Sequence, residues 1–274
     1  MVSQTSIVTA TYNIEFCKRI VLVTKPYSGL CNRLRSLCSC LSLSRFWNIP
    51  LLLYWVPTKA CNCYFHELYE PICEIIDSEQ FWKMISVASS ETLYLSDPLE
   101  GIQFFYRNFL QEYMSYETFW QHFLCFTRRL KIKADLQEII DEFVSQYWQP
   151  GIVGLHLRRT DHIKMFSKRT SVAPYLSTNE KFFQAIDREI TQGTGNFFLA
   201  TDDWETRKIF ESRFVGKTIA YNGQFDTSVF RQTSVQDALI DLYLLSKTRK
   251  IVGSYYSSFS EFASYVGNIP LQFA

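Results

Sequence analysis

Two adjacent arginines and a carboxylate follow a short apolar run that has the character of a buried strand. The run is GIVGL at 151–155, and the chain continues as HLRRTD at 156–161. A planar guanidinium makes paired, charge-assisted hydrogen bonds to phosphate, so two arginines leaving a strand suit an anion with several oxygens, such as a diphosphate. A surface ion-pair network is the alternative interpretation of the same residues.

Two further polar clusters follow apolar runs in the same half of the chain, ATDD at 200–203 and SYYSSFSEF at 254–262. In the second cluster, Ser257 and Ser258 open a helical pattern, where hydroxyls and free backbone amides can bind phosphate. Ordinary helix capping by these serines is the alternative. The aspartates of ATDD also suit a helix N-cap, and a divalent metal is a further possibility, although adjacent carboxylates chelate less readily than spaced ones.

A regular alternation of strands and helices must position these three clusters. The expected elements are strand 152–157, helix 178–192, strand 196–200, helix 203–212, strand 217–220, helix 234–246, strand 250–253 and helix 257–266. Such alternation predicts a doubly wound α/β sheet that binds ligands beyond the carboxyl ends of its strands. Each cluster falls at one of those ends, so we expect the three to line one cleft.

The first half of the chain predicts a second βαβ arrangement. An apolar strand near 20–24 leads through the loop KPYSGLCN into a helix at about 32–47 and a strand at 51–55. The aromatic-rich middle, about 56–130, shows no clean alternation and is interpreted as mainly helical. A helix over 135–148 ends at Gln149, Pro150 and Gly151. We therefore expect two domains, 1–150 and 151–274.

Composition excludes several classes of protein. The 274 residues are 47% hydrophobic, which fits a packed globule, and 28 basic against 27 acidic side chains give a net charge of +1. With so small a net charge, the protein has no overall electrostatic field that would attract nucleic acid or an anionic membrane. No apolar run reaches the roughly 18 residues of a membrane span, and the polar start lacks the layout of a signal peptide. We expect a cytoplasmic protein, with secretion by a dedicated system left open.

Eight cysteines all lie in the first half, several within apolar or helical patterns, which is unlike a disulfide framework. Cys61, Cys63 and His66 invite a metal interpretation. The spacing lacks the second ligand pair of a zinc finger, so reduced and mostly buried thiols are expected instead.

Four segments in order resemble the fucosyltransferase superfamily that includes the α-1,6-fucosyltransferases and the nodulation fucosyltransferases. They are GLCNRLRSLCSCLSLSRFWNIPLLLYW at 29–55, HLRRTD at 156–161, ATDD at 200–203 and SVQDALIDLYLLSKTRKIVGSYYSSFSEFASYV at 234–266. The resemblance implies a GT-B architecture, an α/β fold of two facing Rossmann-like domains with parallel sheets. The C-terminal domain would bind the nucleotide sugar, and the N-terminal one would lie on the acceptor side. GDP-fucose would be the donor, used with inversion and without a metal or other cofactor, and a glycan or glycoconjugate the acceptor.

The resemblance places the family's basic motif on His156, Arg158, Arg159 and Asp161. We expect Arg158 to matter most, because alternate strand positions share a face and His156 and Arg158 would both point into the cleft. A fixed guanidinium there would stabilise the charge that accumulates on the departing diphosphate. Arg159 would either brace the site or contact the same phosphates.

The resemblance also implies donor contacts elsewhere. Asp202 or Asp203 would accept hydrogen bonds from guanine. On the helix at 234–246, Asp237 is preferred to Asp241 as the acidic residue that faces the cleft, because Asp241 has the position of a solvated side chain.

In the N-terminal half, the loop GLCNRLR is no Walker A sequence, since it lacks the Gly-Lys-Ser/Thr ending. Its Asn32 and Arg33 are expected donor contacts from the second domain, whereas Arg35 is expected on the surface or between the domains.

The general base is the point where the chain departs from the family pattern. A family glutamate a few residues after the arginine motif would fall on Phe166 here. Asp161 or His162 would take the role, or a dissociative transition state would need little base. The departure leaves open a noncatalytic sugar-nucleotide or glycan-binding protein and a transferase for another nucleotide sugar. A sulfotransferase or kinase is disfavoured by the missing Walker-type loop.

Aromatic residues could stack on acceptor sugars, yet most of the chain's aromatic side chains must be core. The candidates are Trp55, Tyr64, Phe65 and Tyr69.

Overall fold

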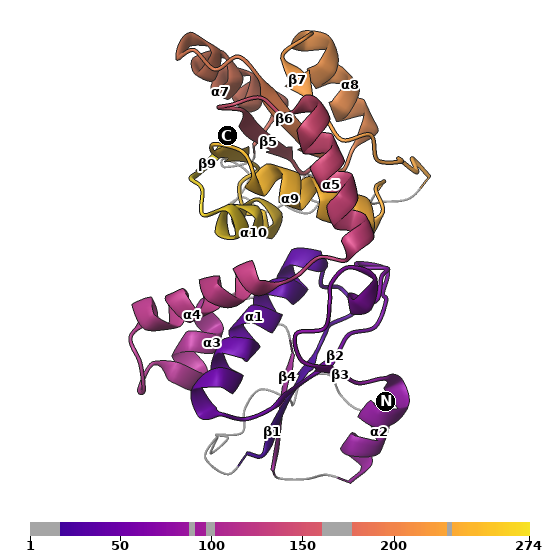
Figure 1. The fold of residues 1–274 in the computed structure, drawn as a ribbon, viewed down its shortest axis with the longest axis vertical. Helices are drawn as coiled ribbons and strands as arrows, with labels where there is room; N and C mark the ends of the chain where they lie inside the picture. The colour runs from indigo at the N-terminus through magenta and orange to yellow at the C-terminus, as the bar shows by residue number, and fades with distance from the viewer. Residues whose placement is uncertain (1–16, 88–90, 97–101, 161–176, 229–231) are drawn as a thin grey trace. The chain divides into compact units, whose positions relative to one another are not determined.

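The computed structural model describes residues 17–87, 91–96, 102–160, 177–228 and 232–274. The chain divides into two compact units, Met1–Lys133 and Ala134–Ala274. Each unit is built on its own parallel sheet with helices packed against it (Figure 1). Among the described residues, no helix is both long enough and apolar enough to cross a bilayer.

The first unit has a four-stranded sheet in the order β3-β2-β1-β4, with every neighbouring pair parallel. Its strands are β1 (Arg19–Val23), β2 (Leu51–Tyr54), β3 (Glu74–Ile75) and β4 (Thr92–Ser96). Its helices are α1 (Leu30–Trp47), α2 (Ser78–Ser86), α3 (Ile102–Phe105) and α4 (Tyr116–Arg129), with short helical segments η2 (Phe65–Glu67) and η3 (Tyr106–Leu110). The expected β1-α1-β2 arrangement is therefore confirmed.

Helix α1 is buried over most of its surface, although it carries several serines. Ser36, Ser39 and Ser42 are buried and each donates a hydrogen bond to the carbonyl four residues earlier. Local bonds of this kind satisfy the hydroxyls, so the small polar residues can lie in the core. The helix ends at Asn48, whose left-handed conformation (φ 52°) closes it before β2.

The interpretation of the middle segment as mainly helical is wrong in part. Residues 92–96 form β4, which pairs with the whole length of β1, and Glu74–Ile75 forms the short strand β3. A five-residue apolar run such as TLYLS cannot be assigned from periodicity alone, because a buried strand and a helical fragment look alike at that length.

The second unit has a five-stranded parallel sheet in the order β7-β6-β5-β8-β9. Its strands are β5 (Val153–Leu157), β6 (Phe197–Thr201), β7 (Thr218–Ile219), β8 (Ile251–Gly253) and β9 (Leu271–Phe273). Its helices are α5 (Ala134–Tyr147), α7 (Asn179–Thr191), α8 (Trp204–Arg213), α9 (Val235–Ser246) and α10 (Ser258–Gly267). The predicted alternation is confirmed, and β9 adds a strand that was not predicted.

Helix α5 belongs to the second unit rather than to the first. Its Phe143 ring makes edge contacts with Phe198 of β6 and with Tyr221, at centroid distances of 5.9 and 6.2 Å. The chain therefore divides between Lys133 and Ala134, before the break at Pro150–Gly151 from which a boundary near 150 was expected. The break at Pro150–Gly151 ends α5, but α5 packs against the sheet that follows it and so belongs to the second unit.

Candidate functional site

The carboxyl ends of three adjacent strands meet in the second unit. Strand β5 lies between β6 and β8, with His156 opposite both Ala200 and Gly253. The residues that follow these strands therefore lie along one edge of the sheet. They are Arg158–Thr160, Asp202–Asp203 and Ser254–Ser257. The structure brings together the three clusters that the sequence places at strand ends.

Buried hydroxyls fix the backbone at this edge. Ser254 is fully buried; its Oγ accepts from the Arg158 backbone N–H (3.0 Å) and donates to the His156 carbonyl (3.1 Å). On the other side, Thr201 Oγ1 donates to the Leu157 carbonyl (2.8 Å). The position of the Arg158 backbone is therefore set by its neighbours on both sides.

The two arginines differ in environment. Arg159 is only 7% exposed, and its guanidinium donates to the Ser177 carbonyl (2.7 Å) and to Asn179 Oδ1 (2.8 Å). Burial lowers its pKa to about 10, against the opposing effect of carboxylates that include Asp202. Arg159 thus braces the start of α7, while its contact with the donor phosphates stays a prediction. Arg158 is half-buried, so its side chain is the more accessible of the pair.

His156 is held by the first turn of α10. The imidazole is buried, its Nδ1 lies 2.7 Å from Ser260 Oγ, and its ring stacks on Phe259 at 4.5 Å. Gly253 makes this approach possible, because a Cβ at that position would lie 2.5 Å from Ser260 Oγ. The imidazole therefore has a fixed orientation between β5 and α10.

Both aspartates of ATDD are hydrogen-bonded to other parts of the protein. Asp202 accepts from the Arg159 backbone N–H (2.7 Å) and from Thr160 Oγ1 (2.6 Å). Asp203 is the N-cap of α8 and accepts from the Thr206 N–H (2.8 Å). The capping interpretation is confirmed for Asp203, while contact of either residue with a nucleobase stays a prediction.

The acidic residues on α9 differ from expectation. Asp237 is half-buried and accepts from Ser234 Oγ (2.8 Å), close to the start of the helix. Asp241 was expected to be solvated, but the residue is only half-exposed: its Oδ1 is enclosed and has no hydrogen-bond partner among the described residues. Burial raises the pKa of Asp241 well above its usual value, with Arg207 opposing the shift. The phenol of Tyr221 has its pKa raised to about 12 by burial and by Asp237.

Arg207 is a part of this region that the sequence did not reveal. It is 7% exposed and donates to the Tyr221 carbonyl (2.8 Å) and to Asn222 Oδ1 (2.7 Å), while pairing with Glu211 (2.8 Å). It fixes the loop after β7 next to Asp241. An arginine in the middle of a polar helix carries no sequence signal for such a role.

The N-terminus of α10 carries the buried hydroxyl of Ser257. Ser257 is fully buried, makes no side-chain capping bond, and its Oγ has no hydrogen-bond partner in the described part of the chain. The capping alternative is therefore not realised by Ser257. Ser258, the first residue of the helix, is half-buried. Tyr256 just before them is left-handed (φ 60°), an uncommon conformation for a bulky residue. The free amides of a first helical turn and this hydroxyl suit an anion.

The two residues expected to act as general base, Asp161 and His162, lie outside the described residues, as does Phe166. Across the ranges that the structure describes, no group of three His, Cys, Asp or Glu side chains is arranged to hold a metal ion. Cys61 and Cys63 are buried thiols that are not joined in a disulfide, as predicted for reduced cysteines.

The two donor contacts expected from the first unit are engaged within that unit. Arg33 is fully buried and donates to Ser28 O (3.0 Å), Val56 O (2.8 Å) and Thr58 Oγ1 (2.7 Å). These bonds engage Arg33 within its own unit, and its contact with a donor stays a prediction. Asn32 accepts from Arg35 Nη2 (2.7 Å) and is half-buried.

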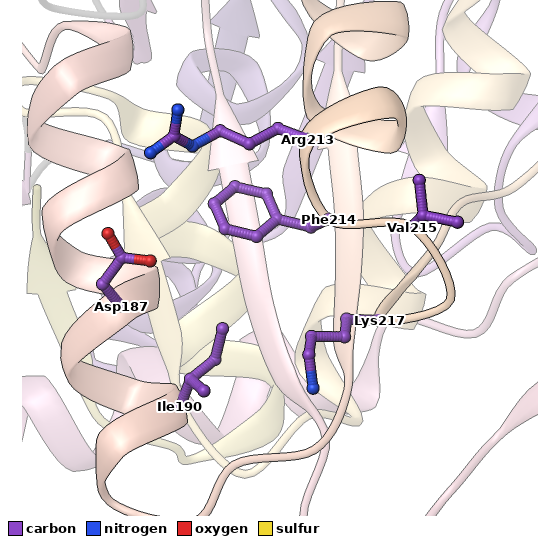
Figure 2. A pocket seen from close by; sticks show the side chains of 6 residues that line it. All are labelled: Asp187, Ile190, Arg213, Phe214, Val215 and Lys217. Atoms are coloured by element: carbon purple, nitrogen blue, oxygen red, sulfur yellow. The ribbon is translucent and has the colours of Figure 1, made fainter.

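A shallow hollow of about 560 Å³ lies elsewhere on the second unit (Figure 2). It is lined by Asp187, Ile190, Arg213, Phe214, Val215 and Lys217. Strand β7 begins at Thr218, directly after this lining, so the hollow lies at the amino end of that strand. It is therefore separate from the carboxyl-end clusters.

Comparisons with known proteins agree with this arrangement. Residues 110–263 match the family model described as "Alpha-(1,6)-fucosyltransferase N- and catalytic domains". A Drosophila melanogaster α-(1,6)-fucosyltransferase is 24% identical over 115 residues, a match that covers 40% of this chain and only 19% of that relative.

Two solved structures are similar in fold. NodZ α-1,6-fucosyltransferase co-crystallised with GDP has a TM-score of 0.59 at 16% identity, covering 90% of this chain and 91% of that one. POFUT1 in complex with GDP has a TM-score of 0.55 at 12% identity, covering 93% and 98%. The likeness shows that the chain has the GT-B type of α/β fold with parallel sheets.

Proposed function

Because the chain belongs to the family of α-(1,6)-fucosyltransferase N- and catalytic domains, we propose that it transfers L-fucose from GDP-fucose to a hydroxyl of a glycan or glycoconjugate. The proposal is carried by one observation. Inside the matched segment, the Arg158 strand end lies beside the N-terminus of α10, where Ser257 Oγ is buried and has no hydrogen-bond partner among the residues that the structure describes. NodZ and POFUT1 have been crystallised with GDP and with GDP-fucose, which supports the same donor here.

The donor diphosphate would bind at this edge of the sheet. The first-turn amides of α10, the Ser257 and Ser258 hydroxyls and the Arg158 guanidinium all favour an anion. Negative charge grows on the diphosphate as its bond to the sugar breaks, so these groups bind the transition state more strongly than the ground state. They would supply the charge stabilisation that a metal ion otherwise provides, and a metal-independent reaction follows. His156 is held at the same place by Ser260.

The acceptor hydroxyl would attack the anomeric carbon from the face opposite the leaving GDP, which inverts its configuration. The new carbon–oxygen bond forms as the bond to the diphosphate breaks, and the hydroxyl proton must pass to a base. Asp161 and His162 are the proposed bases, and a dissociative transition state would reduce the need for either. A noncatalytic sugar-nucleotide or glycan-binding protein is the second candidate, which the residue at Phe166 favours.

Carboxylates near the same edge of the sheet would accept hydrogen bonds from guanine. Asp202, Asp203 and Asp237 are the proposed acceptors, although each already accepts a hydrogen bond within the protein. Asp241 has an enclosed oxygen with no hydrogen-bond partner in the described ranges, so it joins them as a candidate on α9. A cytoplasmic location for the chain is a further expectation of this proposal.

The first experiment compares GDP, GDP-fucose, UDP and ADP by thermal shift and calorimetry, with EDTA present throughout. Selective stabilisation by GDP and GDP-fucose is expected. A preference for UDP or ADP would remove fucose from the proposal. Release of GDP from bound GDP-fucose, with or without an acceptor, separates the enzyme from the noncatalytic alternative.

Arg158→Ala tests the assignment of the diphosphate. We expect GDP affinity to fall by about tenfold to a hundredfold, as for loss of a charge-assisted bidentate bond, with an unchanged thermal midpoint. Arg188→Ala on the exposed face of α7 removes the same charge at a distance and should leave GDP affinity unchanged. Equal GDP affinity in the Arg158 variant and the parent chain would remove Arg158 from the site.

A further inference from the structure

The aromatic side chains of the first unit separate into buried and exposed groups. Of the four residues that sequence offers for sugar stacking, Trp55, Phe65 and Tyr69 are 2%, 1% and 0% exposed and belong to the core. Tyr64 is 47% exposed, and Tyr27, which the sequence did not single out, is 60% exposed. Only Tyr64 of those four candidates is therefore accessible, and Tyr27 joins it.

These two tyrosines follow adjacent strands. Tyr27 lies in the turn after β1 and Tyr64 in the loop after β2, and the two strands pair in parallel up to Val23 opposite Tyr54. Both rings thus belong to the carboxyl edge of the first sheet, the edge at which open α/β sheets bind ligands.

One buried side chain ties the two loops together. Arg33 donates to Ser28 O in the first loop and to Val56 O and Thr58 Oγ1 in the second. Its guanidinium also lies 5.0 Å from the ring centre of Trp55, whose Nε1–H donates to Cys63 O (3.0 Å), the residue before Tyr64. The loops are therefore ordered before any ligand binds, which lowers the entropy cost of binding.

The exposed groups around the rings suit a saccharide. Tyr64 stacks on His66 at 5.4 Å and 19°, and the Lys25 ammonium lies 5.9 Å from the Tyr27 ring centre. Asn62, two residues before Tyr64, is also exposed. An aromatic face packs against the C–H groups of a sugar ring, while amide, imidazole and ammonium groups bind its hydroxyls.

We propose that Tyr27 and Tyr64 form a subsite for the acceptor saccharide, kept in position by Arg33. The ligand is a neutral oligosaccharide with a free hydroxyl. This inference rests on the proposed function for its meaning as an acceptor site. It assigns the subsite to the first unit, whereas the proposed donor groups belong to the second.

The test uses the whole chain and three alanine variants, Tyr27→Ala, Tyr64→Ala and the control Tyr113→Ala. Tyr113 is 52% exposed, so the control removes a ring of similar exposure from the same unit, between η3 and α4. The probes are methyl glycosides and disaccharides of glucose, galactose, mannose and N-acetylglucosamine at millimolar concentration. Saturation-transfer NMR measures saccharide binding, and calorimetry measures GDP binding separately.

We expect at least one probe to bind, and each subsite variant to lose about tenfold in affinity for it, or in kcat/KM through a raised KM if transfer is observed. GDP affinity should not change, and Tyr113→Ala should behave as the parent chain. Phenylalanine at position 27 or 64 should retain most of the binding, because the ring face remains.

Unchanged saccharide affinity in both subsite variants would overturn the inference, as would equal loss in the Tyr113 control or no binding of any probe to the parent chain. Failure of the proposed function would be seen in a different measurement, because neither GDP nor GDP-fucose would then bind in calorimetry. The NMR measurement of saccharide binding does not depend on that result.

Discussion

At the scale of residues, the two arginines at the end of β5 have different surroundings because neighbouring positions on a strand point to opposite faces. Arg159 faces α7 and uses its fork to hold Ser177 and Asn179. Arg158 was expected to share the face of His156, and it keeps a more accessible side chain than Arg159. Of these two adjacent arginines, Arg159 therefore supports the start of α7, and Arg158 is the candidate for binding the diphosphate.

Asp241 gives a prediction at the same scale. Its pKa is raised in the folded chain above the ordinary value of 3.8, so the unfolded chain loses this proton first as pH rises. Folding stability should fall from about pH 4 upward until the folded carboxyl has itself ionised. Asp241→Asn removes this dependence and should raise the free energy of unfolding at neutral pH, with little difference from the parent near pH 4. Denaturant titration at several pH values measures the effect.

Asp237→Asn is the matched control. It changes a half-buried carboxylate that already accepts a hydrogen bond from Ser234, so no gain in stability at neutral pH is expected. A parallel pH dependence in the Asp241 variant and the parent chain would show that the Asp241 carboxyl is hydrated in solution.

At the scale of elements, the site depends on how closely α10 approaches the sheet. Gly253 at the end of β8 lies directly against Ser260, and the approach lets Ser260 contact His156 on the neighbouring strand. The N-terminus of α10, with Ser257, is carried on the same helix. One glycine therefore sets the distance between the candidate anion-binding amides and the strand end of Arg158.

Gly253→Ala tests this dependence. The added Cβ would meet Ser260 Oγ at 2.5 Å and Ser260 Cβ at 2.7 Å, so the helix must move. We expect a loss of about 1–3 kcal/mol in the free energy of unfolding, together with weaker GDP binding. Gly195→Ala, with no atom within 4 Å of its added Cβ, should change neither quantity. Unaltered GDP affinity in the Gly253 variant would mean that α10 takes no part in binding.

At the scale of the whole molecule, each unit carries a parallel sheet and places functional candidates at the carboxyl edge of that sheet. The proposed donor groups belong to the second unit, and the proposed saccharide subsite belongs to the first. The roles of the two units, donor binding in the second and acceptor binding in the first, stay predictions, and the units meet between Lys133 and Ala134.

Hydrogen exchange with and without GDP tests the division. A ligand that binds the folded chain at about 100 times its dissociation constant stabilises it by roughly 2.7 kcal/mol, and local amides at the site should exchange more slowly. We expect the strongest protection in peptides covering 153–160 and 251–262. Protection confined to residues before 134 would place the nucleotide on the first unit and contradict the assignment.

Local patterns along the chain predict most of the second unit and the strand ends that carry its candidate site. Short apolar runs alternate with segments of helical periodicity, and this alternation predicts β5, β6, β7 and β8 in that order along the chain. Connections between parallel strands then bring the carboxyl ends of the strands to one edge of the sheet. The clusters after β5, β6 and β8 could therefore be placed together from HLRRTD, ATDD and the serine-rich segment alone. The strand β4 was missed because a short apolar run has no distinguishing period.

Which side chain of each cluster is accessible depends on the packing of the folded chain. Burial and hydrogen bonding depend on contacts between residues far apart in the chain, such as Arg159 with Asn179 or Gly253 with Ser260. The reversal of expectation for Asp241, and the internal bonds of Arg33, have the same origin. Local sequence specifies the type of a polar group, whereas its solvation is set by the elements packed around it.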